Sequence, residues 1–259
     1  MTQSLKIVEI INIGEELLIG RIVNTNASWL AKKITALGGR VRRITIVGDD
    51  LNEIASAIIE AVNRKPDIII TTGGLGPTFD DKTMEALAKA IGKPLKITSE
   101  SLAALKKACK RRGVPLDEKR MKMAYIPEGG EVLPNPVGLA PGVMVNYEGV
   151  TIVALPGVPD EMKSMFERSL ASRFLGRGFV EAELLVEDIY EADLSPILDK
   201  IIKLFPKVYV KSHPQMRCGK PVITLHLYGR DVTSLELDKV CEEVMNMISS
   251  LGGKISRVK

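Results

Sequence analysis

The chain has 259 residues, of which 45% are hydrophobic and 26% charged, and its formal net charge is +4. These values are typical of a globular protein and exclude disordered, collagen-like and disulfide-scaffold classes. The small basic excess lies before residue 179. It suits an anionic small-molecule ligand but is too weak for a dedicated nucleic-acid binder.

In the first 176 residues, apolar runs alternate with segments of helical period, which is the pattern of an α/β domain with a mostly parallel sheet. The predicted strands cover residues 7–13, 41–47, 67–71, 142–146 and 151–155. The predicted helices cover residues 28–37, 51–63, 81–91, 99–112 and 160–174. Residues 127–142 are rich in proline and glycine, so we expect a loop there.

Gly176, Arg177 and Gly178 predict a linker to a second, small α+β domain over residues 179–259. Its predicted order is strand, helix, strand, strand, helix, at residues 183–190, 195–204, 208–212, 222–228 and 234–251. This order is similar to that of a KH module. Nucleic acid is nevertheless not an expected partner, because the segment is slightly acidic and has no Gly-x-x-Gly loop. An uncovered sheet edge in this domain would favour a homodimer.

The three cysteines, Cys109, Cys218 and Cys241, are widely spaced and form no Cys-x-x-Cys pair. Neither a disulfide framework nor a zinc site is expected. No apolar stretch approaches the ~20 residues needed to span a bilayer, and no signal-peptide pattern opens the chain. We therefore expect a cytoplasmic protein without membrane association.

The most informative segment runs from Thr71 to Thr83 and holds three glycines between a buried strand and a helix. Glycines let a ligand approach the backbone closely, and a helix N-terminus offers free N–H groups to an anion. The segment therefore predicts a phosphate-binding loop. It fits neither standard motif, because Phe79 replaces the third glycine of a dinucleotide fingerprint and Asp81 replaces the second glycine of a P-loop.

Asp80 and Asp81 follow this loop directly and would repel a bare phosphate. The pair predicts a divalent cation of the Mg²⁺ or Co²⁺ type, which would bridge to phosphate oxygens and activate a water. The alternative is that one of the two aspartates caps the following helix.

Other candidate ligand-binding residues lie at segment ends. Gly14 and Glu15 follow the first strand, where parallel sheets bind ligands. Asn24, Thr25 and Asn26 precede a helix, and the alternative is that Thr25 or Asn26 caps that helix. The loop at residues 135–142 offers exposed amides or is plain turn structure. Lys122, which ends a basic run, faces the phosphates or belongs to a solvated surface.

Five motifs occur here in the order known from CinA proteins, so the chain closely resembles the N-terminal region of that family over about residues 5–175. They are Gly14-Glu15-Glu16-Leu17-Leu18; Asn24-Thr25-Asn26; Gly73-Gly74-Leu75-Gly76-Pro77-Thr78 with Asp80-Asp81; Asn135-Pro136-x-Gly138-x-Ala140-Pro141-Gly142; and Leu155-Pro156-Gly157-Val158-Pro159-x-Glu161-Met162. That region contains the molybdopterin-binding domain of molybdenum-cofactor biosynthesis proteins.

The resemblance implies a three-layer α/β domain that binds a nucleotide or pterin phosphate, with molybdopterin itself as one candidate ligand. For the CinA branch it implies a metal-dependent pyrophosphatase that hydrolyses ADP-ribose to AMP and ribose 5-phosphate. The alternative is a non-hydrolytic molybdopterin-binding or adenylyl-transfer protein. Residues 179–259 resemble the small middle domain of CinA proteins. No segment resembles their nicotinamide-nucleotide amidase domain, so that activity is not expected.

On this basis Asp80, Asp81 and Glu15 are the expected catalytic residues, and the two aspartates are the expected metal ligands. The expected ligand-binding set comprises residues within or near the five motifs: Gly14, Asn24, Thr25, Asn26, Thr72, Gly73, Gly74, Leu75, Gly76, Pro77, Thr78, Thr83, Lys122, Asn135, Gly138, Pro141, Gly142, Pro156, Gly157 and Glu161. Two positions depart from the family pattern: Asn24 stands where relatives often have Asp, and Glu15 where many have Asp or Thr.

Overall fold

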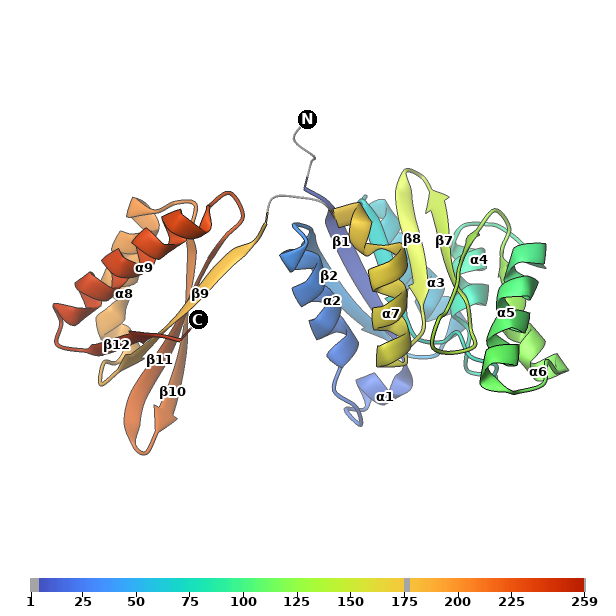
Figure 1. Ribbon diagram of the computed structural model, residues 1–259, viewed down its shortest axis with the longest axis horizontal. Helices are drawn as coiled ribbons and strands as arrows, with labels where there is room; N and C mark the ends of the chain where they lie inside the picture. Colours follow the sequence, from blue (N-terminus) through green and yellow to red (C-terminus); the bar gives the residue numbers. More distant parts are fainter. Residues whose placement is uncertain (1–4, 175–177, 259) are drawn as a thin grey trace. The chain divides into compact units, whose positions relative to one another are not determined.

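The computed structural model describes residues 5–174 and 178–258, and the chain divides into two compact units, Met1–Gly176 and Arg177–Lys259 (Figure 1). The predicted linker falls at this division, but its residues Gly176 and Arg177 lie outside the described part of the chain. Each unit has a hydrophobic core of its own.

The first unit is built on a six-stranded sheet in the order β2-β1-β3-β8-β7-β6. Its strands are β1 (Ile7–Ile13), β2 (Arg40–Val47), β3 (Ile68–Thr72), β6 (Glu131–Leu133), β7 (Gly142–Tyr147) and β8 (Val150–Leu155). The first four in the sheet order pair in parallel, whereas β7 is antiparallel to both of its neighbours. The predicted α/β class with a mostly parallel sheet is confirmed.

Helices cover both faces of this sheet and make three layers (Figure 1). The helices of this unit are α1 (Glu15–Leu18), α2 (Thr25–Ala36), α3 (Leu51–Asn63), α4 (Thr83–Ala90), α5 (Ser99–Arg112), α6 (Glu118–Met121), η1 (Lys122–Ala124), α7 (Pro159–Ser169) and η2 (Ala171–Phe174). Alternate residues of β1 separate the two cores: Val8 and Ile10 pack with α2 and α7, whereas Ile11 and Ile13 pack with α3, α4 and α5. Burial on both faces explains the near-continuous apolar sequence of this strand.

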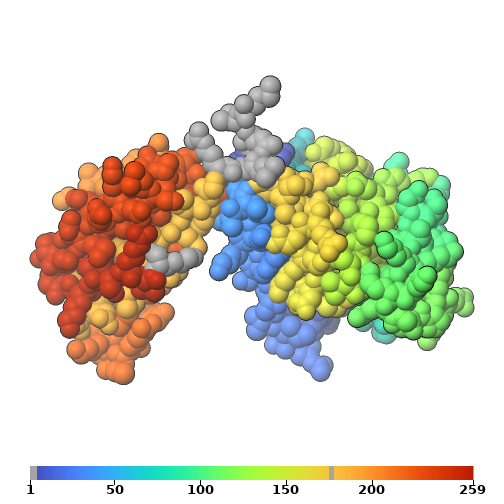
Figure 2. All heavy atoms as spheres, in the orientation of Figure 1, coloured from blue at the N-terminus to red at the C-terminus, as the bar shows by residue number. Residues whose placement is uncertain are grey.

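Two short strands, β4 (Leu95–Ile97) and β5 (Tyr125–Pro127), form a separate antiparallel pair beside α4. The sequence did not predict β4, β5 or β6, and β6 lies within the segment expected to be a loop. Three residues are too few to show an alternating pattern. The segment around α1 projects from the body of the first unit (Figure 2) and exposes Leu18, Ile19, Ile22 and Val23.

The second unit contains β9 (Val180–Glu187), α8 (Glu191–Leu204), β10 (Tyr209–Arg217), β11 (Lys220–Gly229), α9 (Ser234–Ser249) and β12 (Lys254–Arg257). Its antiparallel sheet has the order β10-β11-β9-β12. The sequence missed β12. With this strand the order becomes βαββαβ, the split-βαβ arrangement of ferredoxin-like domains, in place of the KH-like order.

Among the described residues, no helix combines the length and the apolar character that crossing a membrane requires.

Candidate active site

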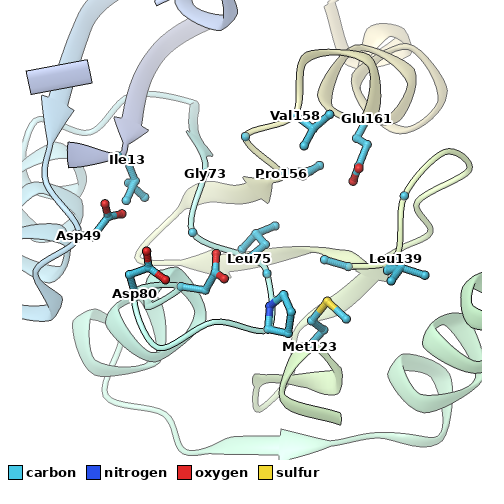
Figure 3. A pocket seen from close by; sticks show the side chains of 18 of the residues that line it. Ile13, Asp49, Gly73, Leu75, Asp80, Met123, Leu139, Pro156, Val158 and Glu161 are labelled. Carbon is cyan, nitrogen blue, oxygen red and sulfur yellow. The ribbon is translucent and has the colours of Figure 1, made fainter. Parts of the chain in front are cut away.

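A cavity of about 790 Å³ opens beyond the carboxyl ends of β1, β3 and β8 (Figure 3). This volume is in the range of small-molecule sites. The cavity brings together twelve residues of the predicted set: Gly14, Gly73, Gly74, Leu75, Gly76, Pro77, Asp80, Asp81, Gly138, Pro156, Gly157 and Glu161. They come from four of the five sequence motifs, which the parallel sheet places at one edge.

The loop after β3 requires its first two glycines. Gly73 has φ +106° and Gly74 has φ +64°, backbone conformations that side chains rarely allow. A Cβ on Gly73 would lie 2.2 Å from the Ile13 carbonyl oxygen, and a Cβ on Gly74 would lie 2.3 Å from Thr83 Oγ1. The buried Thr83 hydroxyl donates to the Gly73 carbonyl at 2.8 Å. Thr83 therefore stabilises the conformation of the glycine loop and does not line the cavity.

The loop after β8 packs directly against the glycine loop. A Cβ on Gly157 would lie 3.2 Å from Gly73 Cα. Asn26 Nδ2, at the start of α2, donates to the Gly157 carbonyl at 2.7 Å, which ties the first helical layer to this wall. Asn26 therefore supports the site through the backbone of a lining residue.

Thr78, Asp80 and Asp81 form an oxygen-rich cluster at the cavity. The Thr78 N–H donates to Asp81 Oδ2 at 2.9 Å, and Thr78 Oγ1 lies 2.5 Å from the same oxygen. Thr78 Oγ1 also contacts Asp80 Oδ1. Because one hydroxyl has one proton, it serves only one of the two carboxylates at a time.

The ionised form of Asp80 is favoured in this cluster. The hydrogen bond from the Thr78 hydroxyl lowers the pKa of Asp80 most, followed by a bond from its own backbone, and the positive charges of Lys122 and Lys82 lower it further. Asp80 is therefore a carboxylate at neutral pH.

The cavity is lined by far more negative than positive side chains. Among the described residues that line it, Glu16, Asp49, Asp80, Asp81 and Glu161 contribute five carboxylates, and Arg112 contributes one guanidinium. Figure 3 shows Asp49 and Asp80 on one side of the cavity and Glu161 on the opposite side. A bare anionic ligand would be repelled by this lining.

The lining residues do not form a closed metal cage, but they can hold a metal ion that is shared with a ligand. Within residues 5–174 and 178–258, no three or more His, Cys, Asp or Glu side chains gather as a ligand set. A closed protein cage is therefore not formed. Mg²⁺, however, is usually held by one or two carboxylates, with waters and substrate phosphates completing its coordination. Asp80 and Asp81 with the Thr78 hydroxyl fit a cation shared with a phosphate ligand.

On the opposite wall, Asn135 positions Glu161. The side chain of Asn135 is buried; its Nδ2 donates to Glu161 Oε2 at 2.7 Å, and its Oδ1 accepts from the N–H of Gly138 at 2.7 Å. A Cβ on Gly138 would lie 1.9 Å from Glu161 Oε2, so only glycine admits the carboxylate here. Asn135 itself does not line the cavity.

Glu15, expected to be catalytic, lies outside this cavity. It lines a neighbouring, more open hollow with Asp49 and Asp80, and its Oε2 lies 2.5 Å from where a Cβ on Gly48 would stand. The next residue, Glu16, lines the main cavity instead.

Several other predicted residues do not line the cavity, and their contacts support the fold instead. Asn24 Oδ1 accepts from the Ala27 N–H at 3.0 Å and caps α2, which explains why this helix begins before the predicted residue 28. Thr25, beside it, is exposed. The buried Thr72 hydroxyl accepts from Asn12 Nδ2 at 2.7 Å.

The end of the proline-rich loop also turns inward. Pro141 is buried, and a Cβ on Gly142 would lie 2.6 Å from the Ala154 carbonyl oxygen in β8. Gly142 therefore permits close pairing of β7 with β8 and does not line the cavity.

The sequence missed several lining residues: Ile13, Glu16, Asp49, Arg112, Val114, Met123, Leu139, Ala140 and Val158. Asp49 carried a usable signal, because it follows β2, whose carboxyl end reaches the same edge of the parallel sheet. Arg112 of α5 carried no such signal. For η1 the signal was partial: its first residue, Lys122, was predicted to face the phosphates, and its Nζ donates to the carbonyl oxygens of Thr78 at 2.7 Å and Asp81 at 2.8 Å, but nothing indicated that Met123 lines the cavity.

Comparisons with known proteins agree with this architecture. Residues 9–175 match the model of the probable molybdopterin binding domain. A protein from Pyrobaculum arsenaticum is 43% identical over 253 residues, covering 94% of this chain and 95% of the relative. A protein from Sulfurisphaera tokodaii is 39% identical over 251 residues, covering 95% of each.

Among solved structures, the protein CinA of unknown function from Thermoplasma acidophilum is 40% identical, with a TM-score of 0.61. The match covers 66% of this chain and 99% of that one. The family match over residues 9–175, together with 40% identity to CinA, shows that the chain belongs to the molybdopterin-binding domain family, as a member of its CinA type.

Proposed function

We propose that the first unit is a metal-dependent nucleotide pyrophosphatase that hydrolyses ADP-ribose to AMP and ribose 5-phosphate. The observation that carries this proposal is the strongly acidic lining of a nucleotide-sized cavity built on a glycine loop. A diphosphate enters such a cavity only together with a cation, and the adjacent Asp80 and Asp81 offer the oxygens to hold one.

In this proposal each wall of the cavity has a separate task. The backbone at Gly73, Gly74 and Gly76 has no side chains in the way, so the diphosphate can approach it closely, while Asp80 and Asp81 hold the cation. When bound, that ion would neutralise the phosphate oxygens and make a water more acidic. Glu161, with one oxygen held by Asn135, accepts a proton from the attacking water with the other. The water oxygen bonds to one phosphorus, and the bond from that phosphorus to the bridging oxygen breaks.

The test is hydrolysis of ADP-ribose by the purified full chain, with AMP measured by chromatography in Mg²⁺, in Co²⁺ or in excess EDTA. Turnover is expected with a divalent ion and not in EDTA. Asp81→Asn should lower turnover about 100-fold or more, because a metal ligand loses its charge. Asparagine still accepts the Thr78 N–H bond, so circular dichroism should show an intact fold.

Asp199→Asn is the matched control, because Asp199 is an exposed aspartate of α8 in the second unit. It should leave turnover unchanged. Equal turnover in EDTA, or full activity of Asp81→Asn, would remove the proposed role of the aspartates.

Family membership supports a second candidate, a molybdopterin-binding or adenylyl-transfer protein that uses the same glycine loop for one phosphate. Calorimetry distinguishes the two. Tight pterin binding by a chain that does not hydrolyse ADP-ribose would favour the second.

A further inference from the structure

The sheet of the second unit has one face covered by helices and one open face. On β9 and β11, every second side chain packs with the buried residues of α8 and α9. Because successive side chains of a strand point to opposite faces, the residues between them lie on the other face. Within residues 178–258, neither helix covers that face. The open face includes Glu183 of β9, Tyr209 and Lys211 of β10, and His226 and Tyr228 of β11.

Aromatic side chains gather on the open face around Tyr228. The centroid of its ring lies 4.9 Å from that of Tyr209, 4.9 Å from that of His226 and 5.4 Å from that of Phe179. Tyr209 is nevertheless 54% exposed. Aromatic residues are enriched at the centre of protein interfaces, where they supply a large contact area. The cluster therefore marks the open face as a surface for a partner.

The charged side chains of the open face are separated by sign. Glu181, Glu183 and Glu187 lie on β9, whereas Lys211 and Arg217 lie on β10, all at the alternate positions that face away from the helices. Strand β11 lies between these two strands. The open face therefore has an acidic strip and a basic strip, one on each side of β11.

Glu183 and Lys211 stand at the same level of the sheet, because both are paired with His226, one from each side. Among residues 5–174 and 178–258, neither side chain has an ion-pair partner. Glu183 is half-buried and Lys211 is exposed. The fold thus leaves two opposite charges uncompensated at matched positions on either side of β11.

We propose that the open face binds the same face of a second copy of this chain, around a two-fold axis that runs along β11. A half-turn about this axis exchanges the two sides of the sheet, so β9 of each copy lies over β10 of the other. Glu183 then lies opposite the partner's Lys211, and Lys211 lies opposite the partner's Glu183. The aromatic cluster lies between the two sheets.

The geometry of packed sheets permits these two ion pairs. Stacked sheets cross at about 30°, and neighbouring strands lie about 5 Å apart. At one strand from the axis, such a crossing shifts facing residues by only about 2–3 Å. Glutamate and lysine side chains are long enough to span this shift. A face with charges of a single sign would repel its own copy, whereas this face is complementary to itself. The contact uses the face of the sheet and not its edge.

The test is the mass of the full chain in solution, measured by light scattering over a range of protein concentrations. Wild-type protein should have twice the mass of one chain. Glu183→Lys and Lys211→Glu each bring like charges together at two symmetry-related points, so each should weaken dimerisation about 100-fold or more. The double variant Glu183→Lys/Lys211→Glu restores opposite charges and should dimerise again. Lys239→Glu, at an exposed position of α9, is the matched control and should leave the mass unchanged.

A further variant tests the contact without changing charge. Tyr209→Ala removes an exposed ring from the centre of the interface and should weaken dimerisation about tenfold or more. Circular dichroism should show that each variant is folded. The proposal is overturned if wild-type protein is a monomer, if the single charge reversals or Tyr209→Ala dimerise as wild type does, or if the double variant stays monomeric. Because these measurements need no turnover, their outcome is separate from that of the proposed function.

Discussion

Asn135 and Glu161, 26 residues apart in the chain, are joined by a 2.7 Å hydrogen bond from Asn135 Nδ2 to Glu161 Oε2. The same amide donates to the Ala140 carbonyl at 3.0 Å and accepts from two backbone N–H groups of the loop. The buried Asn135 side chain thus provides hydrogen-bond partners for the backbone of the loop and holds the Glu161 carboxylate at the cavity wall.

Asn135→Ala should destabilise the first unit by about 2–4 kcal/mol, because it leaves several buried polar groups without partners. Urea unfolding measures the loss. Asn146→Ala is the matched control: Asn146 is exposed and accepts one bond, from the Thr151 hydroxyl, so its change should stay within about 0.5 kcal/mol. Equal losses in the two variants would contradict a special role for Asn135.

The glycine loop allows a comparison at matched backbone angles. Gly74 and Gly92 have φ of +64° and +65°, but a Cβ at Gly74 would lie 2.3 Å from Thr83 Oγ1, whereas nothing lies within 4 Å of one at Gly92. Gly92→Ala should therefore cost only the conformational penalty, about 1–2 kcal/mol. Gly74→Ala should cost more and should abolish ligand binding. Thermal unfolding and calorimetry test both, and similar behaviour of the two variants would show that the contact with Thr83 is unimportant.

An ion triad around the buried Glu9 of β1 should make the stability of the first unit depend on pH. Glu9 is 1% exposed and contacts Arg42 at 2.7 Å and Arg64 at 2.8 Å. Burial raises the pKa of Glu9, but hydrogen bonds from Arg64 and Arg42 and their charges outweigh it, so the pKa is lowered from 4.5. The carboxylate therefore stabilises the fold fully above pH 4.5, and this contribution is lost as pH falls through the lower folded-state pKa.

Glu9→Gln should cost about 2 kcal/mol at pH 7, because the buried side chain loses its charge-assisted hydrogen bonds to two partly exposed arginines. Below pH 4.5 its free energy of unfolding should fall less steeply than that of wild type. Urea titrations between acid and neutral pH give both quantities. Glu131→Gln, at an exposed position of the edge strand β6, should follow the wild-type curve. If the free energy of unfolding of Glu9→Gln fell as steeply below pH 4.5 as that of wild type, protonation of Glu9 would not be linked to stability.

The three cysteines should differ in reactivity. Cys218 is exposed in the turn between β10 and β11, whereas Cys109 and Cys241 are buried, and burial raises the pKa of the Cys241 thiol. One thiol per chain should react with a maleimide in the native state and three in denaturant. Cys218→Ser should remove the native reaction, and rapid native labelling of Cys241 would contradict the packing of α9.

The main elements were predictable because their patterns are strong. Helices α3 and α5 begin and end at the predicted residues 51–63 and 99–112, each with a side-chain cap, Asp50 and Thr98. The short strands β4, β5, β6 and β12 were missed because three or four residues show no reliable period. The site was predictable where glycines and carboxylates follow strands. It was not predictable at Arg112 and Met123, which reach the cavity only through tertiary packing.

Because the cavity draws its walls from residues 13–16, 73–81, 112–123, 138–140 and 156–161, it exists only after the central parallel strands have paired. Any molecule that fills it binds the native chain and not the unfolded one. At a hundred times its Kd, such a molecule would add about 2.7 kcal/mol to the free energy of unfolding. Protease resistance of the first unit would then rise and fall with the supply of its ligand.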